Sequence, residues 1–118
     1  MLSLPPSVRV WLHLPPVDLR KSFDGLAALV REGLAADPLS GHLFVFRNKN
    51  GDRLKVLCWD RDGLVIYYKR LEQGRFVFPL ARDGVGVEVR ATDLLLILAG
   101  VELESVRRQR RYQRPAAS

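Results

Sequence analysis

Two dipeptides that favour tight turns, Asn50-Gly51 and Asp62-Gly63, lie between runs of alternating hydrophobic residues. Asn-Gly and Asp-Gly are preferred in two-residue hairpin turns because the central positions of such a turn need a positive φ. The chain between about Leu43 and Leu71 is therefore predicted to form two consecutive hairpins. Together they make a three-stranded antiparallel meander.

These turns also predict which side chains share a face of the sheet, because alternate residues of a strand point to opposite sides. The first turn sets Phe46 opposite Lys55, and the second sets Trp59 opposite Ile66. One face, the aromatic-basic face, carries Phe44, Phe46, Leu57, Trp59, Ile66 and Tyr68 together with Arg53, Lys55 and Arg70. The other, the apolar face, carries Leu43, Val45, Leu54, Val56, Cys58, Val65, Tyr67 and Leu71, with Arg47 and Lys69 at its margin. The apolar face is predicted to be the core.

Further elements are predicted on both sides of the meander. Residues 8–13 form a short strand at a sheet edge, since the proline pairs around them cannot donate ladder hydrogen bonds. Helical spacing predicts a helix over 21–35, capped by Asp18 or Ser22, and a second one that Thr92 caps and that ends near Gly100. Strands are predicted over 75–80 and 85–90. The fold class is α+β, with a small antiparallel sheet of four to five strands and two helices.

The net charge of +6 is distributed unevenly along the chain. Five arginines lie in one acid-free stretch near the C-terminus: Arg107, Arg108, Arg110, Arg111 and Arg114. Without them, 14 of the 19 basic residues remain against 13 acidic ones, so the rest of the chain is almost neutral. We expect one folded domain over residues 1–106 and a basic, flexible tail over 107–118. Clustered arginine binds polyanions, of which nucleic acid is the abundant cellular example.

The aromatic-basic face allows two interpretations. Aromatic rings among Arg and Lys on an open sheet could stack bases and hold phosphates. Alternatively, a helix or a second subunit covers the rings while the basic side chains extend around the rim, and this interpretation is favoured. Beside the five tail arginines, the candidate nucleic-acid-binding residues are Arg53, Lys55, Lys69, Arg70 and Arg75. The candidate residues for stacking or protein docking are Phe44, Phe46, Trp59 and Tyr68.

The sequence offers little for catalysis. Cys58 is the only cysteine and is expected to be a small buried hydrophobic residue, and His13 and His42 lack partners at metal-binding spacing. A two-metal nuclease site would have to use carboxylates from Asp24, Asp52, Asp60, Asp62 and Glu72. Asp60 and Asp62, however, flank a predicted turn, where Asp is favoured for backbone reasons alone. We expect a non-enzymatic cytoplasmic protein with no cofactor, no metal and no membrane association.

Two segments of the chain resemble a known family: DLRKSFDGLAALV (18–30) and DPLSGHLFVFRNKNGDRLKVLCWDRDGLVIYYKRLEQGRFVFP (37–79). They are similar to the second-open-reading-frame proteins of the IS66 insertion-sequence family, often labelled TnpB. The resemblance runs from about Val8 to Pro115 and includes the blocks SGHLFVFRN, GDRLKVL, WDRDG and KRLEQGRF in this order. It implies a non-catalytic accessory protein encoded beside a larger transposase, which carries the catalytic acidic residues.

Two hypotheses about function remain open. In the first, the protein binds DNA through the arginine tail and the basic residues of the sheet. In the second, it is a protein-interaction module that docks on the transposase or on another accessory protein of the element, with Trp59 and Tyr68 as anchors. Both can hold at once. Steep salt dependence of DNA binding would favour the first.

Overall fold

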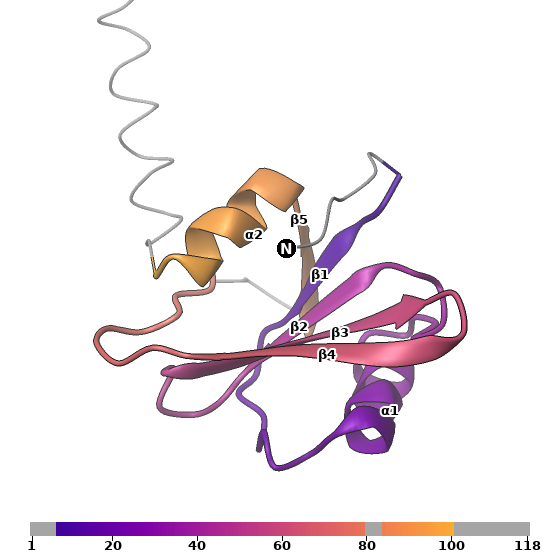
Figure 1. Cartoon of the computed structure of the whole chain (residues 1–118), viewed down its shortest axis with the longest axis horizontal. Coiled ribbons are helices and arrows are strands. Elements are labelled where there is room, and N and C mark those ends of the chain that lie inside the picture. The colour runs from indigo at the N-terminus through magenta and orange to yellow at the C-terminus, as the bar shows by residue number, and fades with distance from the viewer. Residues whose placement is uncertain (1–6, 80–83, 101–118) are drawn as a thin grey trace, which may run out of the picture.

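The computed structural model describes residues 7–79 and 84–100. In chain order their elements are β1 (Val10–His13), α1 (Phe23–Gly33), β2 (Leu43–Arg47), β3 (Arg53–Asp60), β4 (Gly63–Arg70), β5 (Gly86–Val89) and α2 (Ala91–Leu98). The strands form a five-stranded sheet in the order β4-β3-β2-β1-β5 (Figure 1). The predicted α+β class is confirmed.

The sheet is mixed and not purely antiparallel as predicted, because β1 runs parallel to β2 and antiparallel to β5. The prediction that the first strand lies at a sheet edge was therefore wrong, since β1 has a neighbour on each side. Pro15 and Pro16, which follow β1, lie outside the four paired residues and remove no ladder hydrogen bond. The parallel pair needs a crossover connection, and α1 lies within that connection.

The first predicted hairpin has the expected register, with Phe46 opposite Lys55 and Phe44 opposite Leu57. Its turn is longer than two residues, because β2 ends at Arg47 and β3 begins at Arg53. Gly51 lies in this loop with a φ of +77°, the conformation for which glycine was expected there.

The predicted register of the second hairpin was wrong by two residues. Trp59 pairs with Leu64 rather than with Ile66, and Lys55 pairs with Tyr68. The turn is Arg61-Asp62, with Arg61 at a φ of +55°. A shift of two residues leaves every side chain on its predicted face, because side chains alternate with a period of two. The residues assigned to the two faces are therefore retained.

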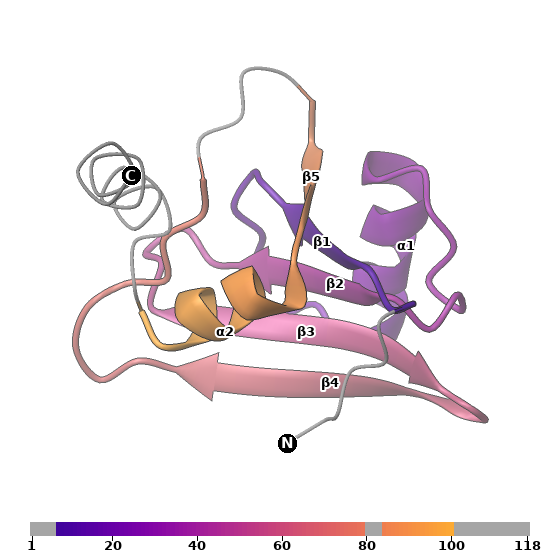
Figure 2. The ribbon, with the colours of Figure 1, turned by 90° about the horizontal axis from the view of Figure 1, so that it is seen from above.

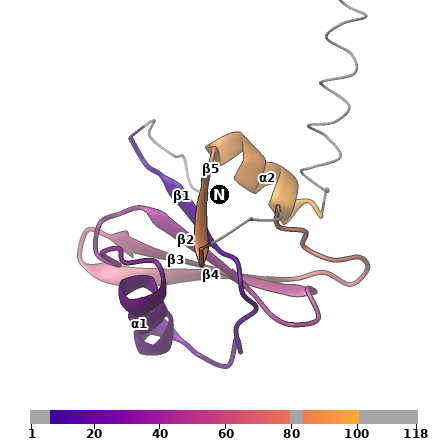
Figure 3. The ribbon, with the colours of Figure 1, turned by 180° about the vertical axis from the view of Figure 1, so that it is seen from behind.

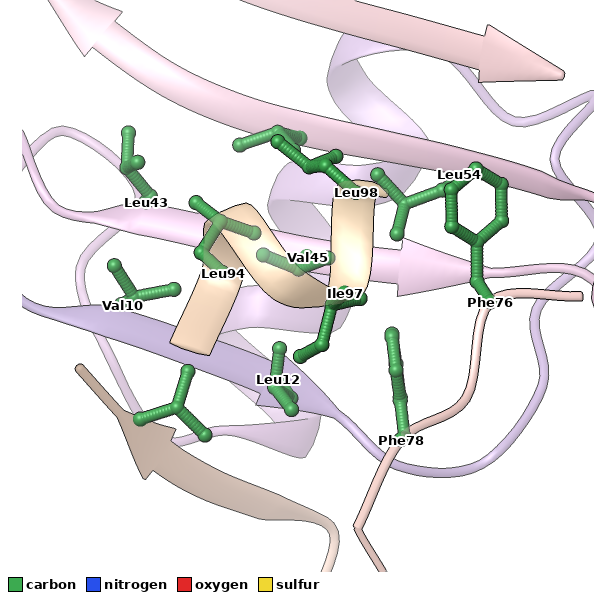
Figure 4. Packing of buried hydrophobic residues seen from close by; sticks show 12 residues of the cluster. Val10, Leu12, Leu43, Val45, Leu54, Phe76, Phe78, Leu94, Ile97 and Leu98 are labelled. Carbon is green, nitrogen blue, oxygen red and sulfur yellow. The ribbon is translucent and has the colours of Figure 1, made fainter. Parts of the chain in front are cut away.

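The two helices cover opposite faces of the sheet (Figures 1 and 3). α2 lies across the apolar face, as Figure 2 shows, and its Leu94, Ile97 and Leu98 enter the main core with residues of β1, β2 and β3 (Figure 4). α1 covers the aromatic-basic face through Leu26 and Val30. Each helix thus buries one apolar stripe against the sheet.

The strand predicted over 75–80 is absent from the described residues of that range, because 75–79 are a loop without strand pairing. The alternation that suggested a strand instead places Phe76 and Phe78 in the main core (Figure 4). The backbone N–H of Phe76 donates to the carbonyl of Gly51 at 2.7 Å, which ties this loop to the β2–β3 turn. The strand predicted over 85–90 is confirmed as β5, which pairs with β1.

Both predicted helices are present, but their starts are stabilised differently from the prediction. Ser22 takes the N-cap position of α1, and its side chain makes no capping hydrogen bond. The N-cap of α2 is Arg90 rather than Thr92. There the Asp93 carboxylate accepts a hydrogen bond from the Arg90 backbone N–H at 3.1 Å. Gly100 follows the end of α2 with a φ of +78°, as expected for a helix that closes there.

Candidate nucleic-acid interface

α1 divides the aromatic-basic face into a covered and an open part. Phe44, Phe46 and Leu57 are fully buried beneath α1. The proposal of Phe44 and Phe46 as stacking or docking residues was therefore wrong, since neither ring reaches the surface. The interpretation that a helix covers the aromatic rings is confirmed for this part of the face.

Of the four predicted aromatic residues, Tyr68 is the one that is substantially exposed, with 49% of its surface accessible. Trp59 is half-buried near the β3–β4 turn, where it pairs with Leu64. Tyr68 lies towards the opposite end of the same hairpin, opposite Lys55. Trp59 as a docking residue stays a prediction.

A hollow with a volume of about 1020 Å³ opens beside Tyr68 at the β2–β3 turn. Three parts of the chain line it: residues 16–20 between β1 and α1, the β2–β3 turn, and the side chains of Arg53, Lys55 and Tyr68. The open part of the aromatic-basic face is therefore concave. Three of the candidate binding residues, Arg53, Lys55 and Tyr68, meet in it.

Lys55 binds the segment before α1, which lines one side of this hollow. The residue is 8% exposed, and its Nζ donates to the backbone carbonyls of Leu19 at 2.7 Å and Lys21 at 2.9 Å. Nζ also lies 4.8 Å from the centre of the Tyr68 ring. An ammonium has three donors, so at most one remains for a ligand. Lys55 therefore joins the segment before α1 to the sheet, and a phosphate contact from it stays a prediction.

Arg53 and Arg70 face each other across β3 and β4. Like charges directly opposite one another in a sheet are unfavourable. The Arg70 guanidinium forms an exposed ion pair with Glu72 at 3.0 Å, and Arg53 donates to the Tyr68 hydroxyl at 3.2 Å. No carboxylate of the described residues lies within ion-pairing distance of Arg53. Arg53 is thus a cation available for an anionic ligand.

Further charged residues gather at the same end of the molecule. Arg75 packs against Gly51 of the β2–β3 turn, and the Arg20 guanidinium hydrogen-bonded to Asp18 lowers the pKa of that carboxyl to about 2. We call this region the basic end, with the cationic residues Arg20, Lys21, Lys49, Arg53, Lys55, Arg70 and Arg75. Its acidic residues are Asp18, Asp52 and Glu72, so its net charge is positive.

Lys69 lies on the apolar face and binds the C-terminal end of α2. Its Nζ donates to the carbonyl of Leu98 at 2.9 Å, at the C-terminal end of the helix. A cation at this position satisfies a terminal carbonyl and complements the helix dipole. Its predicted contact with nucleic acid stays a prediction.

The described chain ends at the basic end. A Cβ atom on Gly100 would lie 3.6 Å from Leu71 Cδ1 and 3.8 Å from the carbonyl oxygen of Arg75. Figures 1 and 2 show the end of α2 beside the segment that follows β4. The tail arginines Arg107, Arg108, Arg110, Arg111 and Arg114 lie outside the described residues. Gly100, the last described residue before them, lies next to Arg75.

The carboxylates considered for a metal site are not brought together. Asp60 and Asp62 lie at the β3–β4 turn, whereas Asp52 lies beyond the opposite end of β3. Within residues 7–79 and 84–100, no three His, Cys, Asp or Glu side chains are grouped so as to hold a metal ion. Cys58 packs against the main core, and burial raises the pKa of its thiol.

Sequence reasoning missed the part of the hollow formed by residues 16–20. This segment follows a strand whose parallel partner could not be read from the hairpin turns. In the fold, the Val17 N–H donates to the Arg47 carbonyl at 2.8 Å and brings the segment against β2. The described parts of the chain contain no helix that is long and apolar enough to span a bilayer.

Comparison with known proteins identifies the family of the chain. The family described as IS66 Orf2 like protein matches residues 8–108. The uncharacterized protein y4hO of Sinorhizobium fredii (strain NBRC 101917 / NGR234) is 40% identical over 102 residues, which cover 86% of this chain and 88% of that protein. The uncharacterized protein y4jC of the same strain is 39% identical over 102 residues, 86% of either chain. No solved structure matches the chain. The chain therefore belongs to the IS66 Orf2-like family, which implies an accessory role in insertion-sequence transposition.

Proposed function

We propose that this protein is a non-catalytic transposition factor that binds DNA through its basic end and its tail arginines. The observation that carries the proposal is the position of Gly100 beside Arg75. Gly100 is the last described residue before the five tail arginines, and it lies where the cations of the folded part gather. The tail and the basic end can then follow one stretch of DNA backbone. Such a protein would act in the bacterial cytoplasm, where the element's DNA lies.

Arginine suits this task because its guanidinium is always charged and can hold a phosphate with two parallel hydrogen bonds. Each phosphate that a protein neutralises releases counterions, and this makes DNA affinity fall steeply with salt. The unfavourable Arg53–Arg70 pair is consistent with such a role, since a bound phosphate would relieve the repulsion between the two guanidinium groups.

A second candidate function is docking on the cognate transposase or on another accessory protein of the element. It is favoured by the exposure of Tyr68 in a concave site, because buried aromatic anchors dominate many protein interfaces. Trp59, half-buried at the other end of the hairpin, is a further candidate anchor. The two functions are compatible with each other.

The DNA-binding proposal is tested with the double variant Arg53→Ser/Arg70→Ser in the full-length protein. Binding to a labelled duplex is measured across a salt series. We expect weaker binding and a salt slope smaller by about 0.9 for each phosphate that the variant no longer neutralises. Because the substitutions remove two facing like charges, the variant should be at least as stable as the wild type.

Arg61→Asn is the control for loss of positive charge away from the basic end. It removes one positive charge from the β3–β4 turn, at the far end of the hairpin from Arg53, and Asn tolerates the positive φ of Arg61. We expect this control to bind DNA like the wild type. Equal affinity and slope in all three proteins would contradict the DNA role of the basic end. Co-purification with transposase that persists in high salt would then support protein docking.

A further inference from the structure

The tyrosine in the hollow has an unusual set of neighbours for an exposed aromatic residue. On its face of the sheet, Lys55 lies directly opposite Tyr68, Arg70 lies two residues along the same strand, and Arg53 lies opposite Arg70. Three cations therefore surround one half-exposed ring. A ligand that matched this arrangement would combine a flat π-system with negative charge.

The ring is also held in place before any ligand binds. Its hydroxyl accepts a hydrogen bond from Arg53 Nη1 at 3.2 Å, and the Lys55 ammonium lies 4.8 Å from its centre. Lys55 is itself fixed by two backbone carbonyls. Side-chain entropy that is already lost in the free protein does not have to be lost on binding. The Tyr68 ring is thus preorganised for a stacking partner.

The hollow has room for a ligand of nucleotide size. Its volume of about 1020 Å³ is comparable to that of small-molecule sites in proteins. Lys49 and Asn50 also line it, and their side chains make no hydrogen bond or ion pair with other described residues. Their donors are available to the edge of a base or to a second phosphate.

From this arrangement we propose that the hollow binds an unpaired nucleotide of single-stranded DNA, with its base stacked on Tyr68 and its phosphate beside Arg53 and Arg70. The inference rests on the proposed DNA-binding function and names the form of DNA that this site selects. In a duplex each base is stacked between its neighbours, so its π-face is not offered to the protein. Single-strand binders combine basic grooves with aromatic side chains in this way.

The test compares single-stranded and duplex oligonucleotides of the same sequence, each bound to the full-length protein at one salt concentration. Tyr68→Leu removes the ring and keeps an apolar side chain, whereas Tyr68→Phe keeps the ring. We expect Tyr68→Leu to weaken single-strand binding by about 5- to 150-fold, the loss expected for one stacked base. Tyr68→Phe should restore most of it. Duplex affinity should change by less than about twofold, because a duplex presents phosphates and not base faces to this site. Thermal melts of both variants establish that they are folded.

A second measurement locates the binding site. Photo-crosslinking of a single-stranded oligonucleotide that carries 5-iodouracil, followed by peptide mass spectrometry, should place the crosslink on Tyr68. An equal loss of single-strand and duplex affinity in Tyr68→Leu would overturn the unpaired-base proposal and leave DNA binding intact. No binding of either DNA by the wild type would instead overturn the proposed function itself. Unchanged DNA binding with weaker capture of transposase would assign the hollow to a protein partner and also overturn the proposal.

Discussion

The two hairpin turns use different residues for the left-handed backbone conformation. Gly51 has a φ of +77° in the β2–β3 turn, whereas in the β3–β4 turn the residue at positive φ is Arg61. Gly63 begins β4 and has no neighbouring atom within 4 Å of the position where a Cβ would lie. Two glycines that look equivalent in the sequence therefore carry different backbone requirements.

Alanine at these two glycines should consequently have unequal effects. We expect Gly51→Ala to lower the free energy of unfolding by about 1–2 kcal/mol, because a Cβ is strained in the left-handed region. Gly63→Ala should change it by less than about 0.5 kcal/mol. Urea denaturation of both variants measures the difference. A larger loss of unfolding free energy in Gly63→Ala than in Gly51→Ala would instead support the turn at Asp62-Gly63 that the sequence predicted.

His13 gives the protein a dependence of stability on pH. Its ring is buried, its Nδ1 donates to the Pro15 carbonyl at 3.0 Å, and it packs 5.4 Å from the Phe46 ring. Burial lowers the pKa of His13 below its ordinary value of 6.5, and the hydrogen bond to Pro15 offsets this only in part. The unfolded chain thus takes up this proton at a higher pH than the folded chain does. The contribution to stability is complete above pH 6.5 and is lost as the pH falls from there towards the folded pKa.

We therefore expect the free energy of unfolding to decrease as the pH falls below 6.5, and His13→Asn to make that decrease smaller. Urea titrations at several pH values measure the slope, and NMR titration of the imidazole gives the pKa directly. A His13 pKa at or above 6.5 would contradict the stated cause.

At the scale of elements, α2 is too short to be helical without support. It has 8 residues, fewer than the roughly 12 that a marginally stable isolated helix needs. Its apolar stripe packs on the sheet. Hydrogen bonds from Arg90 to Asp93 at its first turn and from Lys69 to Leu98 at its last turn stabilise its two ends. The Asp93 side chain is almost completely buried and accepts hydrogen bonds from both the backbone N–H and the guanidinium of Arg90. This carboxylate takes the capping role that the sequence assigned to Thr92.

Replacement of Asp93 should therefore cost more than replacement of Thr92. We expect Asp93→Ala to destabilise the fold by about 1–2 kcal/mol, because it leaves a helix-terminal N–H without its acceptor. Thr92→Ala, at an exposed position in the first turn, should cost less than about 0.5 kcal/mol. Thermal melts of the two variants give the comparison. A larger loss of stability in Thr92→Ala than in Asp93→Ala would instead indicate that Thr92 caps α2, as the sequence predicted.

The sequence predicted which face of the sheet each side chain lies on more reliably than it predicted which residues and strands pair. Alternation assigned every residue of the meander to its correct face even though the second register was wrong, because the error was an even number of residues. Whether Arg61 or Gly63 adopts a positive φ depends on where β3 ends, and no local sequence pattern predicts that position. Nor does alternation say which strand lies beside β1. Its parallel pairing with β2 became visible only in the fold.

The candidate site was also predictable only in part: the sequence indicated the face on which its residues lie but not the segments that surround them. Tyr68 and Arg53 were found because they lie on a face where aromatic and basic residues alternate. Phe44 and Phe46 lie on that face as well, but sequence could not show how far α1 would extend over it. The segment 16–20 joins the hollow through long-range backbone hydrogen bonds, which no local pattern encodes.

At the scale of the whole molecule, charge is separated along the long β3–β4 hairpin. The basic end lies at one extremity, around Arg53 and Arg70, and Asp60 and Asp62 lie at the other. At about 3.3 Å per residue, β3 alone separates Arg53 from Asp60 by roughly 23 Å. This exceeds the Debye length of about 8 Å at physiological ionic strength, so the β3–β4 turn, with Asp60, Arg61 and Asp62, does not neutralise the basic end. The proposed DNA contact is therefore expected at this extremity, where Gly100 also lies.

Truncation after Val106 tests the largest part of this arrangement, because it removes the five arginines that carry nearly all of the net charge. We expect the truncated protein to remain folded with an almost unchanged melting temperature, since charged residues at a chain end bury little surface. It should lose most of its affinity for non-specific duplex DNA. If the tail neutralises about five phosphates, the slope of log K against log salt should fall by about 0.9 for each of them. Duplex binding of both proteins across a salt series, with thermal melts alongside, measures these quantities. Equal affinities and equal slopes would make the tail a solubilising segment, and any binding of DNA would then depend on the basic end alone.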